Sequence, residues 1–254
     1  MAVSTEQVKD GVHRVADGLV NWYLVEDGGR LAIVDAGWPR SWPRIEQAIR
    51  ALGRSPADVD SVLLTHGHPD HMGAAERART TIGVPVRASR AEVGRVRGEA
   101  KGSSPLLLVP GLVPQLRRPA AVKFVLQATA QGFLWPTWVK EVHPFDIGDE
   151  LDAPGRPRVI ATPGHTEGHV SFHFSSRGVL ISGDAIATLD PISGARGPRL
   201  VHDVLHAEPA RTRASLAAIE AIEADTLLPG HGDPWRGSMA DAVAQARAAD
   251  ASGP

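Results

Sequence analysis

The strongest constraint on this chain is the segment "LLTHGHPDHMGA", residues 63–74, which places three histidines and one aspartate within six positions. The apolar run just before it, "DSVLLT" (60–65), is typical of a strand that is buried on both faces. The segment that follows, "GAAERARTTIG" (73–83), has the pattern of a helix. The cluster is therefore expected on a loop that leaves a central strand, where α/β folds carry their chemistry.

Similar polar residues follow three other predicted strands. The segments are "TPGHT" (162–166), "SGDA" (182–185) and "PGHG" (229–232). Together the four loops offer nitrogen and oxygen ligands for metal ions: His66, His68, Asp70, His71, His165, Asp184 and His231. Such ligands suit zinc, manganese or iron, and zinc is the usual metal of hydrolytic sites. This number of ligands is too large for one tetrahedral ion, so we predict two Zn²⁺ ions, with Mn²⁺ or Fe²⁺ as alternatives, that share a carboxylate.

Composition narrows the class of protein. The chain has no cysteine, which excludes disulfides, thiolate metal ligands and cysteine nucleophiles. Its formal net charge of −2 gives no general reason to expect a nucleic-acid or membrane partner, although it leaves open a local charged patch. The N-terminal segment lacks the pattern of a secretion signal, and the most apolar stretch, 105–116, is too short to span a bilayer. We therefore expect a cytoplasmic protein that acts on a small molecule.

The order of the predicted elements indicates one α/β domain over residues 1–254. The patterns predict helices over 41–53, 73–83, 210–222 and 239–249. They predict strands within 12–35, 60–65, 84–89, 158–166, 169–184 and 225–233. The Pro- and Gly-rich residues 190–199 are expected to form a loop. Strands and helices in both halves of the chain favour a layered αββα packing.

Five motifs in order carry a resemblance to a known family. They are "IVDAG", "THGHPDH", "TPGHTEGH", "SGD" and "PGHG", and they span residues 33–232. The chain resembles the metallo-β-lactamase-fold hydrolases, in the branch similar to glyoxalase II and the lactonases that has a bridging aspartate. The resemblance implies a four-layer αββα sandwich with two metal ions. The first ion is expected on His66, His68 and His165, the second on Asp70, His71 and His231, with Asp184 bridging the two.

The same resemblance implies a reaction and two supporting residues. It implies hydrolysis of a carbonyl ester-type bond, in a thioester, lactone or ester, by a hydroxide that bridges the metal ions. Asp70 is expected to accept and return a proton as the catalytic residue. Asp35 and His169 match positions just behind the ligands, where a side chain orients a ligand. Tyr23, the only tyrosine, is expected to pack in the core, and the histidines without a motif are expected in the core or at the surface: His13, His143, His173, His202 and His206.

Other functions stay open at this point. Asp184 disfavours a true β-lactamase, because those enzymes lack the aspartate bridge, but β-lactam hydrolysis could occur as a side activity. A second alternative is an oxidoreductase that resembles the persulfide dioxygenases, with one iron ion on His66, His165 and Asp184. A third is a binding protein on the same scaffold. Metal content and turnover of thioesters or lactones would separate these functions.

Residues 98–143 interrupt the regular order of strands and helices. The stretch is rich in Leu, Val and aromatic residues, among them Phe133 and Trp135. Long insertions in compact domains are usually functional. We expect a helical lid over the active site, with Phe133 and Trp135 lining an apolar channel, which would favour a substrate with an apolar group. Core packing or a contact in a homodimer is the alternative role.

Overall fold

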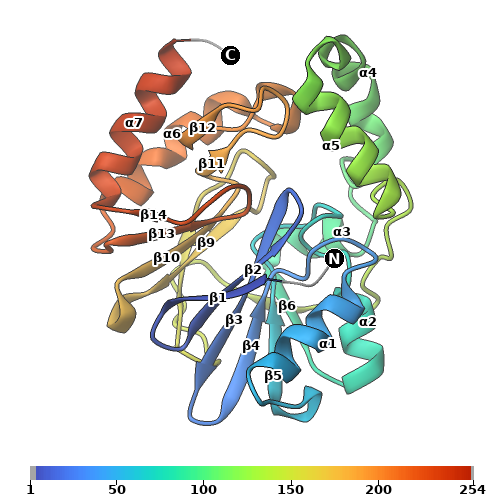
Figure 1. Cartoon of the computed structure of the whole chain (residues 1–254), viewed down its shortest axis with the longest axis vertical. Helices are drawn as coiled ribbons and strands as arrows, with labels where there is room; N and C mark the ends of the chain where they lie inside the picture. Colours follow the sequence, from blue (N-terminus) through green and yellow to red (C-terminus); the bar gives the residue numbers. More distant parts are fainter. Residues whose placement is uncertain (1–3, 253–254) are drawn as a thin grey trace.

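Two β-sheets lie face to face in the middle of the molecule (Figure 1), a computed structural model that describes residues 4–252. The first sheet has the strand order β1-β2-β3-β4-β5-β6-β7. Its first four strands form an antiparallel meander, and β4 to β7 run parallel. The bounds are β1 Ser4–Lys9, β2 Val12–Asp17, β3 Val20–Asp27, β4 Arg30–Val34, β5 Val59–Leu63, β6 Val86–Ser89 and β7 His143–Phe145.

The second sheet has the order β14-β13-β10-β9-β8. Within it β10 and β13 are parallel, whereas the other neighbours are antiparallel. A separate ribbon pairs β11 with β12. The bounds are β8 Arg158–Ala161, β9 Val170–Phe174, β10 Val179–Gly183, β11 Ala187–Leu189, β12 Arg196–Arg199, β13 Thr226–Pro229 and β14 Trp235–Arg236.

Helices cover the outer face of each sheet, which gives four layers (Figure 1). Because side chains alternate across a strand, β4 turns Leu31 and Ile33 toward α1 and turns Ala32 and Val34 toward the second sheet. Strand β10 alternates in the same way between the inter-sheet core and the helices α6 and α7. The helices of the layers are α1 Trp42–Ala51, α2 Ala75–Ile82, α3 Val93–Val96, α6 Pro209–Glu220 and α7 Met239–Ala251.

The αββα architecture and most of the predicted elements are confirmed. The loop predicted over 190–199 is wrong, because Arg196–Arg199 forms β12, which pairs with Ala187–Leu189. Glycine and proline hide this short strand in the sequence. Strand β1 was also not predicted. Ser41 precedes α1, but its hydroxyl accepts a hydrogen bond from the backbone of Trp38 and does not cap the helix.

We call residues 98–143 the insertion. It contains α4 (Val109–Leu112), α5 (Pro119–Ala130) and short 3₁₀ turns at 105–108 and 113–117. Phe133 packs edge-on against Trp38 of the first half, with ring centroids 6.2 Å apart. The expectation that Trp135 lines a channel is wrong, because 70% of this residue is exposed on the surface. Within residues 4–252 every helix is too short or too polar to cross a membrane.

Candidate metal centre

The seven predicted ligands lie together where strands of the two sheets end. The loop with His66, His68, Asp70 and His71 follows β5, whereas the other three ligands follow β8, β10 and β13. His68 is partly exposed and the other six side chains are buried. Residues up to 165 positions apart in the chain, His66 and His231, therefore meet in one small volume, as expected for strands whose carboxyl ends share an edge.

Three imidazoles form the first group. The Nδ1 atom of His68 lies 3.1 Å from Nε2 of His66 and 2.8 Å from Nε2 of His165. Ring nitrogens at these distances can all reach one ion, since zinc–nitrogen bonds are about 2.0–2.1 Å long. The group matches the set predicted for the first metal ion.

Asp70, His71 and His231 form the second group. One carboxylate oxygen of Asp70 lies 3.8 Å from Nε2 of His71 and 3.6 Å from Nε2 of His231. Asp184 lies between the two groups. Its Oδ2 atom is 3.3 Å from Nε2 of His165 and 3.2 Å from Nε2 of His231, and its Oδ1 atom is 3.5 Å from Nε2 of His71. This carboxylate faces both groups, as a shared ligand would.

The carboxylate of Asp35 fixes the orientation of two of these histidines. It accepts hydrogen bonds from the backbone N–H of Thr65 at 2.8 Å and from the Thr65 hydroxyl at 2.8 Å. It also accepts from Nδ1 of His71 at 2.9 Å. Because the Thr65 hydroxyl donates to Asp35, its oxygen accepts from Nδ1 of His66, which is 3.0 Å away. In the neutral form that binds a metal ion, both imidazoles therefore present an unprotonated Nε2 to the site.

These tautomers fit a bound cation. His231 donates from Nδ1 to the carbonyl oxygen of Leu19 at 2.6 Å, so in its neutral form the Nε2 lone pair points at Asp184. In the same way, Nε2 of His71 faces Oδ1 of Asp184, and both atoms are buried without a hydrogen-bond partner among the described residues. A lone pair opposite a carboxylate oxygen is repulsive unless a positive charge lies between them. The donor set and its buried, unpaired atoms thus suit a divalent metal ion.

The pKa values reflect the same arrangement. Burial alone would lower the pKa of His71, but the carboxylates of Asp184 and Asp70 raise it well above the usual value. The pKa of His231 is raised through the same two carboxylates, against the effect of burial. Burial instead lowers the pKa values of the first group, namely His66, His68 and His165, well below the usual value. Metal binding would therefore displace protons, mainly from the second group.

The turn after β10 holds Asp184 in place. Gly183 ends the strand with a φ of 52°, which a residue with a side chain rarely adopts. The next backbone N–H, that of Asp184, donates to Nε2 of His169 at 3.0 Å. Burial lowers the pKa of His169 to about 3, so the ring is neutral, and its Nδ1 can donate to the Thr162 hydroxyl at 2.9 Å. His169 therefore contacts a predicted ligand in the way that the sequence suggests.

Two residues near the ligands were not predicted to lie there, although His206 was expected in the core or at the surface. His206 is buried, and its Nδ1 lies 3.1 Å from Nδ1 of His165. Glu92 is fully buried and accepts hydrogen bonds from the backbone N–H groups of Gly67 at 2.7 Å and Gly168 at 2.9 Å. It thus ties the loop of the first motif to the loop after β8. Neither residue belongs to a motif, so the sequence carried no signal for them.

Tyr23 has a structural role, as the sequence predicts. Its ring lies in the core between the sheets, and its hydroxyl donates to the carbonyl oxygen of Pro229 at 2.6 Å. Burial raises the pKa of this hydroxyl, which disfavours its use as a base. The contact instead secures β13 two residues before His231.

The comparison with known proteins agrees with this site. The sequence profile of the metallo-beta-lactamase superfamily matches residues 15–231, which include all seven ligand candidates. The chain belongs to the metallo-beta-lactamase superfamily. It is 29% identical over 251 residues to the probable metallo-hydrolase YflN of Bacillus subtilis, covering 89% of this chain and 86% of the relative. It is 27% identical over 245 residues to a hydroxyacylglutathione hydrolase of Acidiphilium cryptum, covering 91% of this chain and 76% of the relative.

Solved structures support the same assignment. The metallo-beta-lactamase family protein TTHA1429 of Thermus thermophilus has 26% sequence identity and a TM-score of 0.65, over 91% of this chain and 75% of that one. A B3 metallo-beta-lactamase with an active site glutamic acid superposes with a TM-score of 0.68, over 98% of this chain and 89% of that one. At 22% identity this likeness shows the fold alone. The superfamily and its hydrolase members make this protein a metal-dependent hydrolase, as predicted.

Replacement of Asp35 by Asn should weaken metal binding about 10- to 100-fold, the usual cost of losing a partner behind a ligand. Asn tolerates the positive φ of 57° at this position, so the backbone can be retained. Its amide cannot accept every hydrogen bond that the carboxylate accepts, and His66 and His71 would lose their fixed tautomers. Competition with a chromogenic chelator measures the affinity. Asp152→Asn is the control, because the side chain of Asp152 is 97% exposed. Equal metal affinities of the two variants would contradict the role of Asp35.

Proposed function

We propose that this protein is a dinuclear zinc hydrolase that cleaves a carbonyl ester-type bond in a thioester, lactone or ester. The observation that carries the proposal is the position of Asp184, because its two oxygens face histidines of both ligand groups. A carboxylate between two groups of three ligands is the arrangement that two divalent ions need. The relative named as a hydroxyacylglutathione hydrolase supports an acyl compound as the substrate.

The proposed ligands divide as the two groups do. One ion would be held by His66, His68 and His165, the other by Asp70, His71 and His231, and Asp184 would touch both. A pair of bound divalent ions supplies Lewis acidity for the carbonyl oxygen and lowers the pKa of water. Asp70 is the proposed proton carrier, because its carboxylate borders the second group and is almost completely buried there.

We further propose that the insertion is a lid and that the substrate has an apolar group. The insertion packs in an apolar cluster with Leu19, whose carbonyl oxygen holds His231, and with Leu205, which precedes His206. Leu108 and Leu112 of the insertion contact this cluster and are only partly buried. Apolar side chains therefore lie close to residues that contact His231 and His165, which favours an acyl chain or an aromatic group over a small charged substrate.

A series of thioesters, lactones and esters with increasing acyl-chain length tests the proposed reaction. With metal-loaded protein, kcat/KM should rise with chain length, by at most about fourfold per methylene, the equivalent of about 0.8 kcal/mol. Leu112→Ala should reduce the slope at unchanged metal content, whereas Ile147→Ala, at a residue outside the insertion that is 55% exposed, should not. A flat profile would contradict the apolar substrate, and the absence of turnover for all three classes would contradict the reaction.

Asp70→Asn and Asp184→Asn should impair the enzyme in different ways. Loss of the Asp184 carboxylate removes the negative charge between the two cations, so metal affinity should fall first. Loss of Asp70 should lower kcat even at saturating metal, because the proton carrier is absent. Metal content and kcat measured on the same samples separate the two effects. Full activity of Asp70→Asn with both ions bound would rule out proton transfer by Asp70.

A further inference from the structure

The insertion carries most of the large hydrophobic residues that are exposed in the described part of the chain. Of the nine large hydrophobic residues that are exposed within residues 4–252, eight lie between residues 106 and 135. We call these eight residues the insertion patch: Leu106, Leu107, Val109, Val113, Leu116, Val122, Leu126 and Trp135. The ninth, Ile147, lies outside the insertion. Soluble monomers rarely gather exposed apolar side chains in this way unless the surface binds a partner.

The patch covers consecutive elements that pack on each other. On α5, Ala121, Phe124 and Ala128 are buried, whereas Val122 and Leu126 lie on the outer face. Leucines and valines thus occupy an outer helix face that is normally polar. Between α4, the 3₁₀ turn at 113–117 and α5 lies an apolar cavity of about 120 Å³. Its wall includes Val109, Val113 and Leu116, so the cavity is lined in part by the patch itself.

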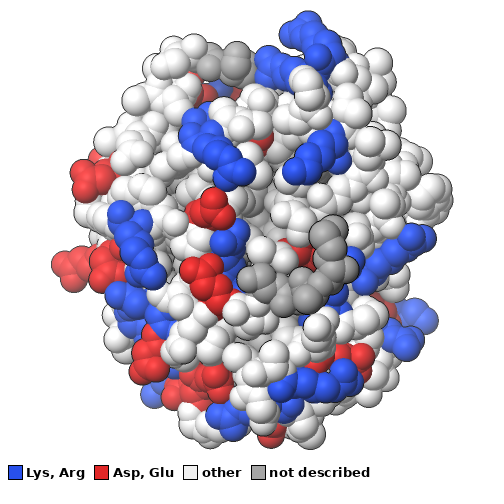
Figure 2. Space-filling model, viewed as in Figure 1, with Lys and Arg blue, Asp and Glu red and all other residues white. Residues whose placement is uncertain are grey.

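The charged side chains that residues 100–140 themselves contribute all have the same sign. Between Glu99 and Glu141 the sequence contains no Asp or Glu, but it contains Lys101, Arg117, Arg118, Lys123 and Lys140. Arg117 and Lys123 are exposed, and neither forms an ion pair with an acidic side chain of residues 4–252. Elsewhere exposed arginines such as Arg90 and Arg156 pair with carboxylates. Figure 2 shows the result, since the surface over α4 and α5 at the upper right is white and blue without red.

Exposed apolar side chains next to unpaired cations favour one kind of partner over others. A symmetric homodimer would place the patch against itself and bring the unpaired cations of two copies together, which is unfavourable. Nucleic acid would satisfy the cations but would leave the leucines and valines without apolar contacts. The surface of an anionic bilayer offers both an apolar interior and negative headgroups. An exposed tryptophan such as Trp135 is typical of side chains that lie at a membrane–water interface.

We propose that the insertion patch docks on the surface of a bilayer that contains anionic phospholipid. The exposed leucines and valines enter the region between the headgroups and the acyl chains, and Arg117 and Lys123 contact the headgroups. The protein binds as a peripheral protein, which agrees with the absence of a spanning helix among the described residues. This inference does not depend on the proposed reaction, because it concerns a surface and not the metal centre.

Co-sedimentation of the full chain with sucrose-loaded vesicles tests the docking directly. Binding to vesicles of phosphatidylcholine and phosphatidylglycerol in equal parts should be about tenfold or more stronger than binding to phosphatidylcholine alone, and it should weaken with added salt. Leu107→Gln/Leu126→Gln should reduce binding about tenfold, because two apolar side chains no longer enter the bilayer. Ile147→Gln is the matched control outside the patch and should bind as the parent does.

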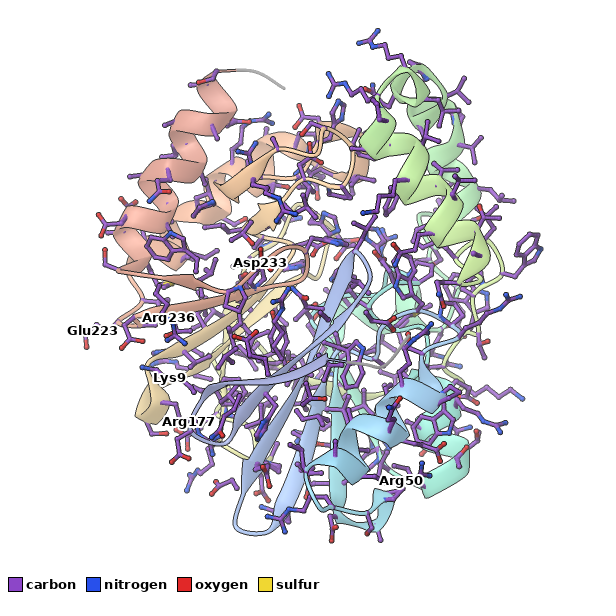
Figure 3. The ribbon with its side chains drawn as sticks, in the orientation of Figure 1. Lys9, Arg50, Arg177, Glu223, Asp233 and Arg236 are labelled. Carbon is purple, nitrogen blue, oxygen red and sulfur yellow. The ribbon has the colours of Figure 1, made fainter. Side chains whose placement is uncertain are left out.

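A second pair of variants tests the charges. Arg117→Glu/Lys123→Glu should abolish the preference for the anionic vesicles. Arg50→Glu is the matched control, because Arg50 lies on α1, 62% of its side chain is exposed, and Figure 3 shows it far from α4 and α5. The proposal would be overturned if Leu107→Gln/Leu126→Gln bound vesicles as strongly as the parent and the control Ile147→Gln. It would also be overturned if the parent bound neither kind of vesicle. A parent dimer that Leu107→Gln/Leu126→Gln converts to a monomer, measured by light scattering, would also overturn it and assign the patch to a second copy.

Discussion

The carboxylate of Asp35 is the interaction on which the metal centre depends most. It lies behind the ligands and accepts hydrogen bonds from Thr65 and His71, and through the Thr65 hydroxyl it also sets the tautomer of His66. A carboxylate can only accept, so it forces the ring protons to the far side and leaves the Nε2 lone pairs in the site. Asp35 lies directly after β4, with a positive φ of 57°.

The sequence predicts the layers and the ligand candidates because both follow from local patterns. The apolar runs identify the buried strands, and the polar residues after each run are carried to one edge by the topology. His206 and Glu92 could not be predicted, because their contacts join segments whose approach depends on the tertiary fold. Strand β12 was missed since its composition is that of a loop, and Trp135 was misplaced since aromatic character does not tell which side of a segment is buried.

The insertion has two faces with different environments. Its inner face, with Phe124 and Phe133, joins the apolar cluster that includes Leu19, whose carbonyl oxygen accepts from His231. Its outer face exposes leucines, valines and unpaired cations. The insertion thus gathers at one place most of the large hydrophobic residues that are exposed within residues 4–252. Because the proposed lid and the proposed docking surface belong to the same segment, contact with a bilayer would be coupled to access to the metal centre.

The central claim is that two metal ions share Asp184. Crystals of metal-loaded protein, with anomalous diffraction on both sides of the zinc absorption edge, measure the number of ions and their ligands together. The account predicts two zinc ions, one on His66, His68 and His165 and one on Asp70, His71 and His231, with Asp184 at about 2 Å from each. A fully loaded site that holds one ion on His66, His165 and Asp184, with the second group empty, would contradict it.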